Sequence, residues 1–123
     1  AYRARPRRAP EADVDAGTLV LVHLHSPKEK YWGALRALTP AGVTVRGIDV
    51  ALFDDWARQF LSGGEPELGV TTLFLPLHRV EKMFEDSRVG TVAAYHERFF
   101  EMVGRDVRDV LRLDSSRPDG PLQ

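Results

Sequence analysis

Cysteine is absent from this chain, and several other marks of a function class are missing with it. Zero cysteines exclude a disulfide framework and any thiolate metal site. No apolar run is long enough for a signal segment or a membrane span, so we expect a cytoplasmic protein. No Ser/His/Asp or Cys/His nucleophile pattern is present, and Gly63-Gly64 lacks the following Lys-Ser/Thr of a phosphate loop. The sequence therefore predicts a non-catalytic protein without a cofactor.

Length and charge suggest one domain with loose ends. The 123 residues, 43% of them hydrophobic, suffice for one compact core. The formal net charge is -1, but the N-terminal arm contains four arginines and no acid before residue 11: Arg3, Arg5, Arg7 and Arg8. Without these four, 13 basic side chains face 18 acidic ones, so the remainder carries about -5. We predict a disordered basic arm over 1–16, a single domain over 17–112 and a disordered tail over 113–123.

The stretch from residue 31 to 49 predicts a β-hairpin. Pro40 suits the second position of a type I turn, and Gly42 suits the left-handed position that follows. Apolar and polar residues alternate after the turn, as in a strand with one wet face. An apolar strand over residues 18–25 precedes this hairpin.

Two helical regions follow from periodicity and capping. Residues about 50–62 show an amphipathic helical stripe, with Asp49 as N-cap and Gly63 as C-cap. Residues about 91–111 predict C-terminal helices, with Thr91 as the first cap and Gly104 as a break. Between the two regions, residues 71–77 and 78–84 predict short strands bent at Pro76, which cannot donate a ladder hydrogen bond. Five short strands in this order suggest a small, strongly bent barrel.

Two segments carry a resemblance to a known family. In YWGALRALTPAGVTVRG, Gly33 and Leu35 lie where Sm-like proteins have the Gly and the apolar residue of their first motif. LPLHRVEKM, residues 75–83, is similar to the second motif of the bacterial host-factor branch, with Val80 and Met83 at its buried positions. The fold class expected over residues 18–84 is thus α+β: a five-stranded antiparallel Sm-like or SH3-like β-barrel, with an inserted helix and a C-terminal helical appendage.

The resemblance implies RNA contacts as one alternative function. His78 lies at the place of the branch's RNA-contacting His, with Arg79 and Lys82 beside it, and the arginine arm would attract phosphates. The Sm pattern has an acid and an Asn after the second strand, whereas this chain has residues 39–42, TPAG, there. The acidic body and this departure favour a protein partner over RNA.

A metal site is a second alternative. Residues 17–29 read G-x5-H-x-H-x3-E and resemble the first part of the cupin metal motif, with His23, His25 and Glu29 as ligands. The closing Gly of that motif is replaced by Arg36. Two histidines on a strand without a metal role also explain the pattern.

The leading hypothesis is a binding module for another protein or for a second copy of the chain. Edge strands of a small barrel offer backbone groups for pairing, and homo-oligomers are expected among the outcomes. The candidate contact residues lie on the hairpin and the inserted helix: Trp32, Arg36, Arg46, Phe53 and Trp56. The aromatic members of this set equally suit docking of the inserted helix onto the sheet.

Overall fold

The computed structural model describes residues 17–63 and 67–115. The predicted arm over 1–16, with its four arginines, lies outside the described residues. The predicted tail begins at 113, but the last helix continues to Ser115, so only 116–123 lie outside the description at that end.

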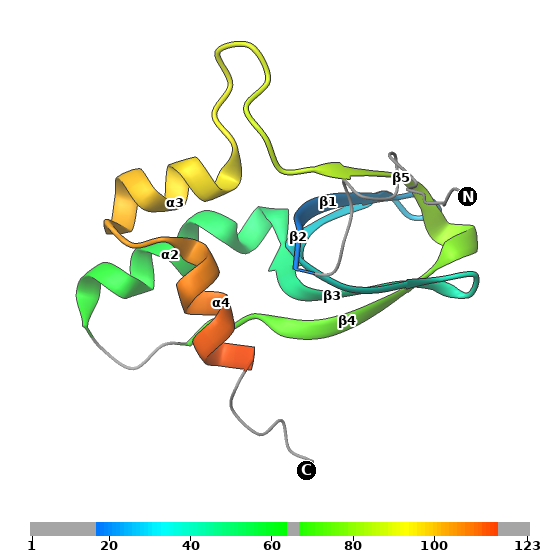
Figure 1. The fold of residues 1–123 in the computed structure, drawn as a ribbon, viewed down its shortest axis with the longest axis horizontal. Coiled ribbons are helices and arrows are strands. Elements are labelled where there is room, and N and C mark those ends of the chain that lie inside the picture. The colour runs from blue at the N-terminus through cyan, green and yellow to red at the C-terminus, as the bar shows by residue number, and fades with distance from the viewer. Residues whose placement is uncertain (1–16, 64–66, 116–123) are drawn as a thin grey trace, which may run out of the picture.

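One five-stranded antiparallel sheet organises the fold, as the sequence predicted (Figure 1). Its strands are β1 (Leu19–Leu24), β2 (Glu29–Thr39), β3 (Gly42–Asp49), β4 (Thr71–Pro76) and β5 (Val80–Glu85). They lie in the order β4-β3-β2-β1-β5. The expectation of an α+β fold with an antiparallel sheet and helices is confirmed.

The sheet is open, which corrects the closed barrel of the sequence prediction. Across the described residues, β4 pairs with β3 and β5 pairs with β1, and no ladder joins β4 to β5. Pro76 bends the chain, as predicted, into a short 3-10 turn, η2 (Leu77–Arg79), which connects the two edge strands. The sheet stays open because of this connection. β4 runs into the turn and β5 runs out of it along opposite margins of the curved sheet (Figure 1).

The helices follow the predicted order. After η1 (Val50–Leu52) come α2 (Phe53–Ser62), α3 (Tyr95–Val103) and α4 (Val107–Ser115). The Asp49 carboxylate accepts a hydrogen bond from the Ala51 N–H at 2.8 Å, so the predicted N-cap is present. Gly63 and Gly104 end α2 and α3 in the left-handed conformation, with φ of 73° and 82°. In the described part of the chain, no helix is long and apolar enough to cross a membrane.

The start of α3 differs from the prediction. Thr91 does not cap it, because residues 89–92 form a small exposed turn closed by two backbone hydrogen bonds between Val89 and Val92. The helix begins at Tyr95. This turn projects from the body between β5 and α3 (Figure 1).

The turn of the hairpin also differs in one detail. Gly42 does not have a positive φ; it pairs with Thr39, whose Oγ1 accepts hydrogen bonds from the Ala41 and Gly42 N–H groups. Glycine is needed there for space, since a Cβ would lie 2.3 Å from the Leu75 carbonyl oxygen. Thr39 therefore stabilises the turn, and Gly42 admits β4.

The sheet buries apolar side chains on both faces. One face forms a cluster from β1, β2, β3 and β4: Val20, Val22, Leu24, Leu35, Val43, Val45 and Leu75. The other face packs Leu21, Trp32 and Ile48 against α2, α3 and α4. Each strand residue points to the face opposite its neighbours, so the nearly continuous apolar run of β1 supplies both clusters. The helices thus cover one face of a sheet that curves around the other cluster.

Candidate functional site

A buried carboxylate joins the sheet to α3. Asp86 follows β5 and is 3% exposed. Its oxygens accept hydrogen bonds from the Trp32 indole N–H at 3.0 Å and from the backbone N–H groups of Tyr95 and His96 at 2.8 and 2.9 Å. These two amides are the first of α3, so Asp86 acts as a helix cap from a distant part of the chain.

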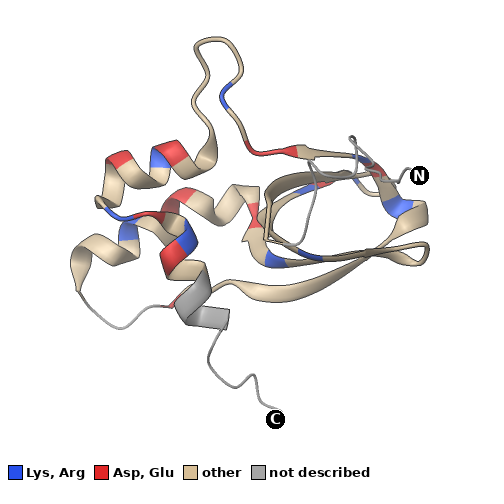
Figure 2. Ribbon diagram, in the orientation of Figure 1, with Lys and Arg blue, Asp and Glu red and all other residues tan. Residues whose placement is uncertain are grey.

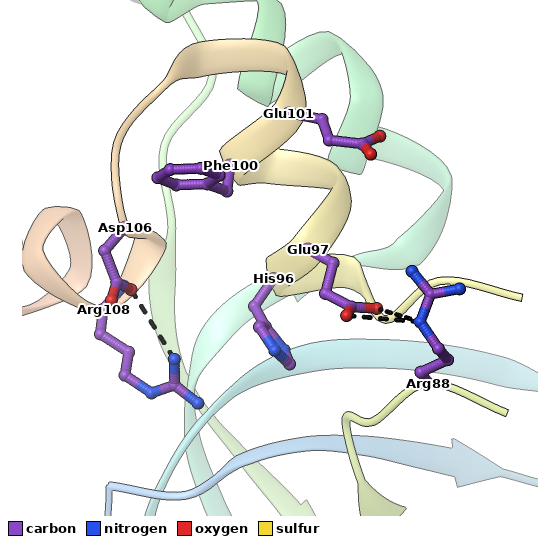
Figure 3. A pocket seen from close by; sticks show the side chains of 7 residues that line it. All are labelled: Arg88, His96, Glu97, Phe100, Glu101, Asp106 and Arg108. Carbon is purple, nitrogen blue, oxygen red and sulfur yellow. Dashed lines mark hydrogen bonds and ion pairs between the residues drawn. The ribbon is translucent and has the colours of Figure 1, made fainter.

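His96 completes this junction and opens onto a pocket of about 340 Å³ (Figure 3). Its Nδ1 lies 3.1 Å from Asp86 Oδ2, which fixes the orientation of the ring. Salt bridges Arg88–Glu97 (3.4 Å) and Arg108–Asp106 (3.7 Å) line the pocket, and the Phe100 ring is also at its wall. A carboxylate-oriented imidazole can accept or donate a proton. The contacts between His96 and Asp86, however, are explained by their role in attaching α3 to the sheet.

Glu97 reinforces the start of α3. Its Oε1 accepts a hydrogen bond from the Ala94 N–H at 2.8 Å. This backbone hydrogen bond, and then the neighbouring Arg88 guanidinium, lower the pKa of the Glu97 carboxyl below its ordinary value. Ala94, the N-cap residue, has no polar side chain that could accept a hydrogen bond from a helix amide. Glu97 and Asp86 therefore together provide the hydrogen bonds of a capping box.

A second, open hollow of about 620 Å³ lies at the end of the sheet where β1 ends and β2 begins, beside η1. We call it the lysine hollow; it is lined by His23, Leu24, Lys28, Glu29, Lys30, Asp49, Val50, Ala51, Glu81 and Lys82. His23 lies directly across from Lys30 on β2 and from Lys82 on β5. Burial of the ring, and next the charges of Lys30 and Lys82, lower the pKa of His23.

The structure does not bring the three residues of the predicted metal site together. His23 pairs with Lys30, whereas Glu29 pairs with Leu24, so Glu29 and His23 point to opposite faces of the sheet. His25 lies beyond the end of β1, with its Nδ1 3.1 Å from Ser26 Oγ. Glu29 is bound to Arg79 at 3.0 Å. Across the residues that the structure describes, no group of three or more His, Asp or Glu side chains is placed to hold a metal ion.

The predicted partner surface is largely buried. Trp32 and Phe53 are 0% exposed and Trp56 is 3% exposed, and their rings contact one another in the core beneath α2. This corrects their assignment as contact residues and agrees with the alternative in which they dock the inserted helix. Arg46 is also buried, and its Nη1 donates to Thr72 Oγ1 at 3.1 Å. Arg36 is exposed, in a bulge between Leu35 and Ala37 of β2.

The predicted RNA contacts are not gathered in one place. Arg79 donates hydrogen bonds to the carbonyl oxygens of His25 and Pro27 at 3.1 and 2.8 Å, in addition to its salt bridge with Glu29. It therefore holds the β1–β2 turn against η2. His78 is exposed on η2, and Lys82 lies in the lysine hollow. Arg3, Arg5, Arg7 and Arg8 lie outside the described residues.

The margin of β4 is a further candidate surface. Phe74 is 54% exposed on this strand, and Leu77 immediately after it is 46% exposed. The strand, TTLFLP, has no charged residue, and the uniform tan of β4 in Figure 2 shows this. Strand edges without charge are the ones most open to pairing.

Two features of these sites were missed from the sequence. The role of Asp86 has no local signal, since its partner Trp32 is 54 residues away. The lysine hollow combines Lys28 and Lys30 with a residue of β5 that only the strand pairing brings near. The lysine positions are the signal in the sequence that could have indicated this hollow. No protein-family model, no curated protein and no solved structure matches the chain.

Proposed function

We propose that this chain is a non-catalytic binding module with an Sm-like or SH3-like sheet, and that it self-associates by adding a strand to the edge of β4. The observation that supports the proposal most directly is the unpaired outer margin of β4. Within the described residues, every ladder contact of this strand is with β3, from Gly42↔Pro76 to Gly47↔Thr71. Its other margin presents backbone N–H and C=O groups that another strand can satisfy.

The two edges of the sheet differ in a way that favours β4. β5 carries Glu81, Lys82 and Glu85, and its pairing with β1 shifts register between His23 and Leu24. Charges and bulges are the usual devices that blunt an edge strand. β4 has neither charged residues nor a bulge. The residue in this strand that hinders pairing is Pro76, at its end. The charges and the bulge make β5 a poor edge for pairing, and their lack makes β4 the better one.

A second copy of this chain is the occupant that the edge suits best. Two β4 strands can pair antiparallel about a two-fold axis, so that the same surface serves both copies and the assembly closes as a dimer. Pairing would also cover the exposed Phe74 ring and its neighbour Leu77, which adds apolar burial to the backbone hydrogen bonds. A β4-to-β5 contact would instead place the charged, bulged edge in the interface.

The test is the mass of the protein in solution as a function of concentration. We expect the unaltered chain to form a dimer by light scattering or sedimentation. Phe74→Lys should weaken the dimer by more than about tenfold, because a lysine on an edge strand disfavours pairing. The matched control is Leu61→Lys, which alters an equally exposed apolar residue on α2 and should leave the dimer intact.

Two outcomes would contradict the proposal. One is an unaltered chain that remains monomeric at every concentration measured. The other is a Phe74→Lys protein, folded by circular dichroism, that dimerises as well as the unaltered chain.

A further inference from the structure

The lysine hollow gathers all three lysines of this chain. Lys28 lies in the β1–β2 turn, Lys30 on β2 and Lys82 on β5. Their side chains are exposed, and within the part of the chain that the structure describes no salt bridge involves them. The ammonium groups are therefore free to change position in the hollow.

The charges of the hollow are balanced. Three acids, Glu29, Asp49 and Glu81, line it together with the three lysines. Their carboxylates keep their negative charges, even where one of them is bound to an arginine, as Glu29 is to Arg79. A balanced set of charges attracts an anion only weakly. The chemistry that remains for the lysines is that of an amine nucleophile, which depends on a neighbouring base and not on net charge.

His23 is the base in the hollow, and Lys30 is the lysine nearest to it. The two residues lie directly across from each other on β1 and β2. The Leu35 N–H donates to the Thr18 carbonyl oxygen at 2.8 Å, and hydrogen-bonded positions alternate along an antiparallel ladder. Lys30 and His23 therefore form a non-hydrogen-bonded pair, with Cα atoms about 4.5 Å apart, in which the side chains are closest.

Lys82 and Lys28 are farther from the imidazole. Lys82 lies across from His23 on β5. In that ladder the Asp86 N–H donates to the Leu19 carbonyl oxygen at 2.8 Å, so Lys82 and His23 form a hydrogen-bonded pair, with Cα atoms about 5.5 Å apart. Lys28 lies in the turn, outside both ladders. The strand register thus ranks the lysines by distance from the ring.

The His23 ring is suited to accept a proton. Its pKa is lowered by burial first, then by the charge of Lys30, and then by that of Lys82, which follows the order of their distances. The imidazole is therefore neutral at neutral pH and has a nitrogen lone pair available. Val50 and Ala51 of η1 form an apolar part of the wall, where a short acyl chain can lie.

We infer that Lys30 is a modification site, acylated by a thioester with the His23 imidazole as proton acceptor. The Lys30 nitrogen, as the free amine, attacks the thioester carbonyl carbon, so that an N–C bond forms and the C–S bond breaks. His23 takes the proton that the nitrogen loses and passes it to the departing thiolate, which leaves one amide and one thiol as products. Acylation removes the positive charge of Lys30 and leaves the hollow with an excess of acids.

The first experiment measures acetylation of the full chain by S-acetyl-N-acetylcysteamine at mildly alkaline pH, with the rate at each lysine followed by mass spectrometry. This thioester is uncharged, so attraction of an anionic donor plays no part. Lys30 should react at least about tenfold faster than Lys28, because a positioned base assists proton transfer. Lys28 is the internal control, since it is exposed in the same hollow. Equal rates at the two lysines would overturn the inference.

The second experiment removes the base. His23→Gln should lower the rate at Lys30 to that at Lys28, and should leave Lys28 itself unchanged. The matched control is His78→Gln, which alters an exposed histidine on η2 and should leave all three rates unchanged. A folded His23→Gln protein in which Lys30 keeps its rate would contradict the role of the imidazole. If this variant does not fold, the comparison of Lys30 with Lys28 in the unaltered chain still decides.

A third experiment separates proton transfer from accessibility. Reductive methylation with formaldehyde and a borohydride reagent labels exposed amines without a thioester, and the three lysines should react at similar rates because all are exposed. Preferential methylation of Lys30 would show that its reactivity does not depend on thioester chemistry, and would overturn the inference. This modification goes beyond edge pairing, and failure of one is distinct from failure of the other, since no residue of β4 lines the hollow.

Discussion

Single side chains decide the local electrostatics of this protein, and His23 is the clearest case. Its pKa lies below the ordinary value of 6.5 because of burial first, and then because of Lys30 and Lys82. The folded state therefore takes up a proton on this ring less readily than the unfolded chain does. The resulting contribution to stability is present above about pH 6.5 and is lost as the pH falls through the lowered folded pKa.

We predict that Lys30→Gln combined with Lys82→Gln raises the pKa of His23. Burial of the ring persists, so the value should remain below 6.5. An NMR titration of the His23 ring protons measures this, with Arg58→Gln as the control that leaves the titration unchanged. An identical titration in the double variant would show that the two lysines do not act on the ring.

Arg79 shows how one residue's chemistry depends on its setting. The resemblance to Sm-like proteins implied an RNA contact for this residue, because it follows His78. In the folded protein, its guanidinium instead binds two carbonyl oxygens and the Glu29 carboxylate. A guanidinium offers several donors in a fixed plane, so it is well suited to fasten one turn to another.

At the scale of the elements, two facing glycines set how closely β2 and β3 approach. Gly33 and Gly47 lie directly across from each other in the ladder. A Cβ on Gly47 would stand 2.0 Å from the Trp32 carbonyl oxygen and 2.6 Å from the Gly33 Cα. Neither atom can move without moving its strand. The close pair therefore requires glycine at both positions.

We predict that Gly47→Ala destabilises the protein by about 3 kcal/mol, because it forces β2 and β3 apart. Chemical denaturation measures the loss. Gly69→Ala is the matched control, since a Cβ there would meet nothing within 4 Å and should change stability little. A Gly47→Ala protein as stable as the control would contradict the close approach of these strands.

The helices were easier to predict than the way in which they join the sheet. Asp49, Gly63 and Gly104 act on groups within a few residues, so their capping roles follow from local sequence. Thr91 is an equally suitable residue in isolation. It lost this role because residues 89–92 form a turn of their own and because Asp86 satisfies the first amides of α3.

For the whole molecule, Asp86 is the link between its two layers. A single buried carboxylate holds the Trp32 indole on β2 and the first turn of α3. A second contact joins α2 to α3 nearby, where Arg98 binds the Asp54 carboxylate and stands over the Phe53 ring at 5.5 Å. The helical layer thus depends on a small number of polar contacts in addition to its apolar core.

We predict that Asp86→Ala lowers the free energy of unfolding by about 3 kcal/mol, because the Trp32 indole and two helix amides lose their acceptor. Hydrogen exchange should increase in α3 more than in β1–β3. Asp55→Ala, which breaks only an exposed salt bridge with Arg58, is the control and should cost less than about 1 kcal/mol. Equal effects of the two substitutions would show that Asp86 is not the link between the layers.

The sequence by itself determined the order of the strands and helices, the bend at Pro76, and the caps at Asp49, Gly63 and Gly104. Each of these depends on periodicity or on a side chain that acts on its near neighbours. Only the tertiary structure decided that the sheet stays open, that Trp32, Phe53 and Trp56 are core residues, and that Glu29 faces away from His23. It also decided where the lysines meet, because Lys82 is 52 residues from Lys30 and adjoins it only through β1. Strand register sets which side chains share a face, and a local stretch of sequence contains no record of the register of distant strands.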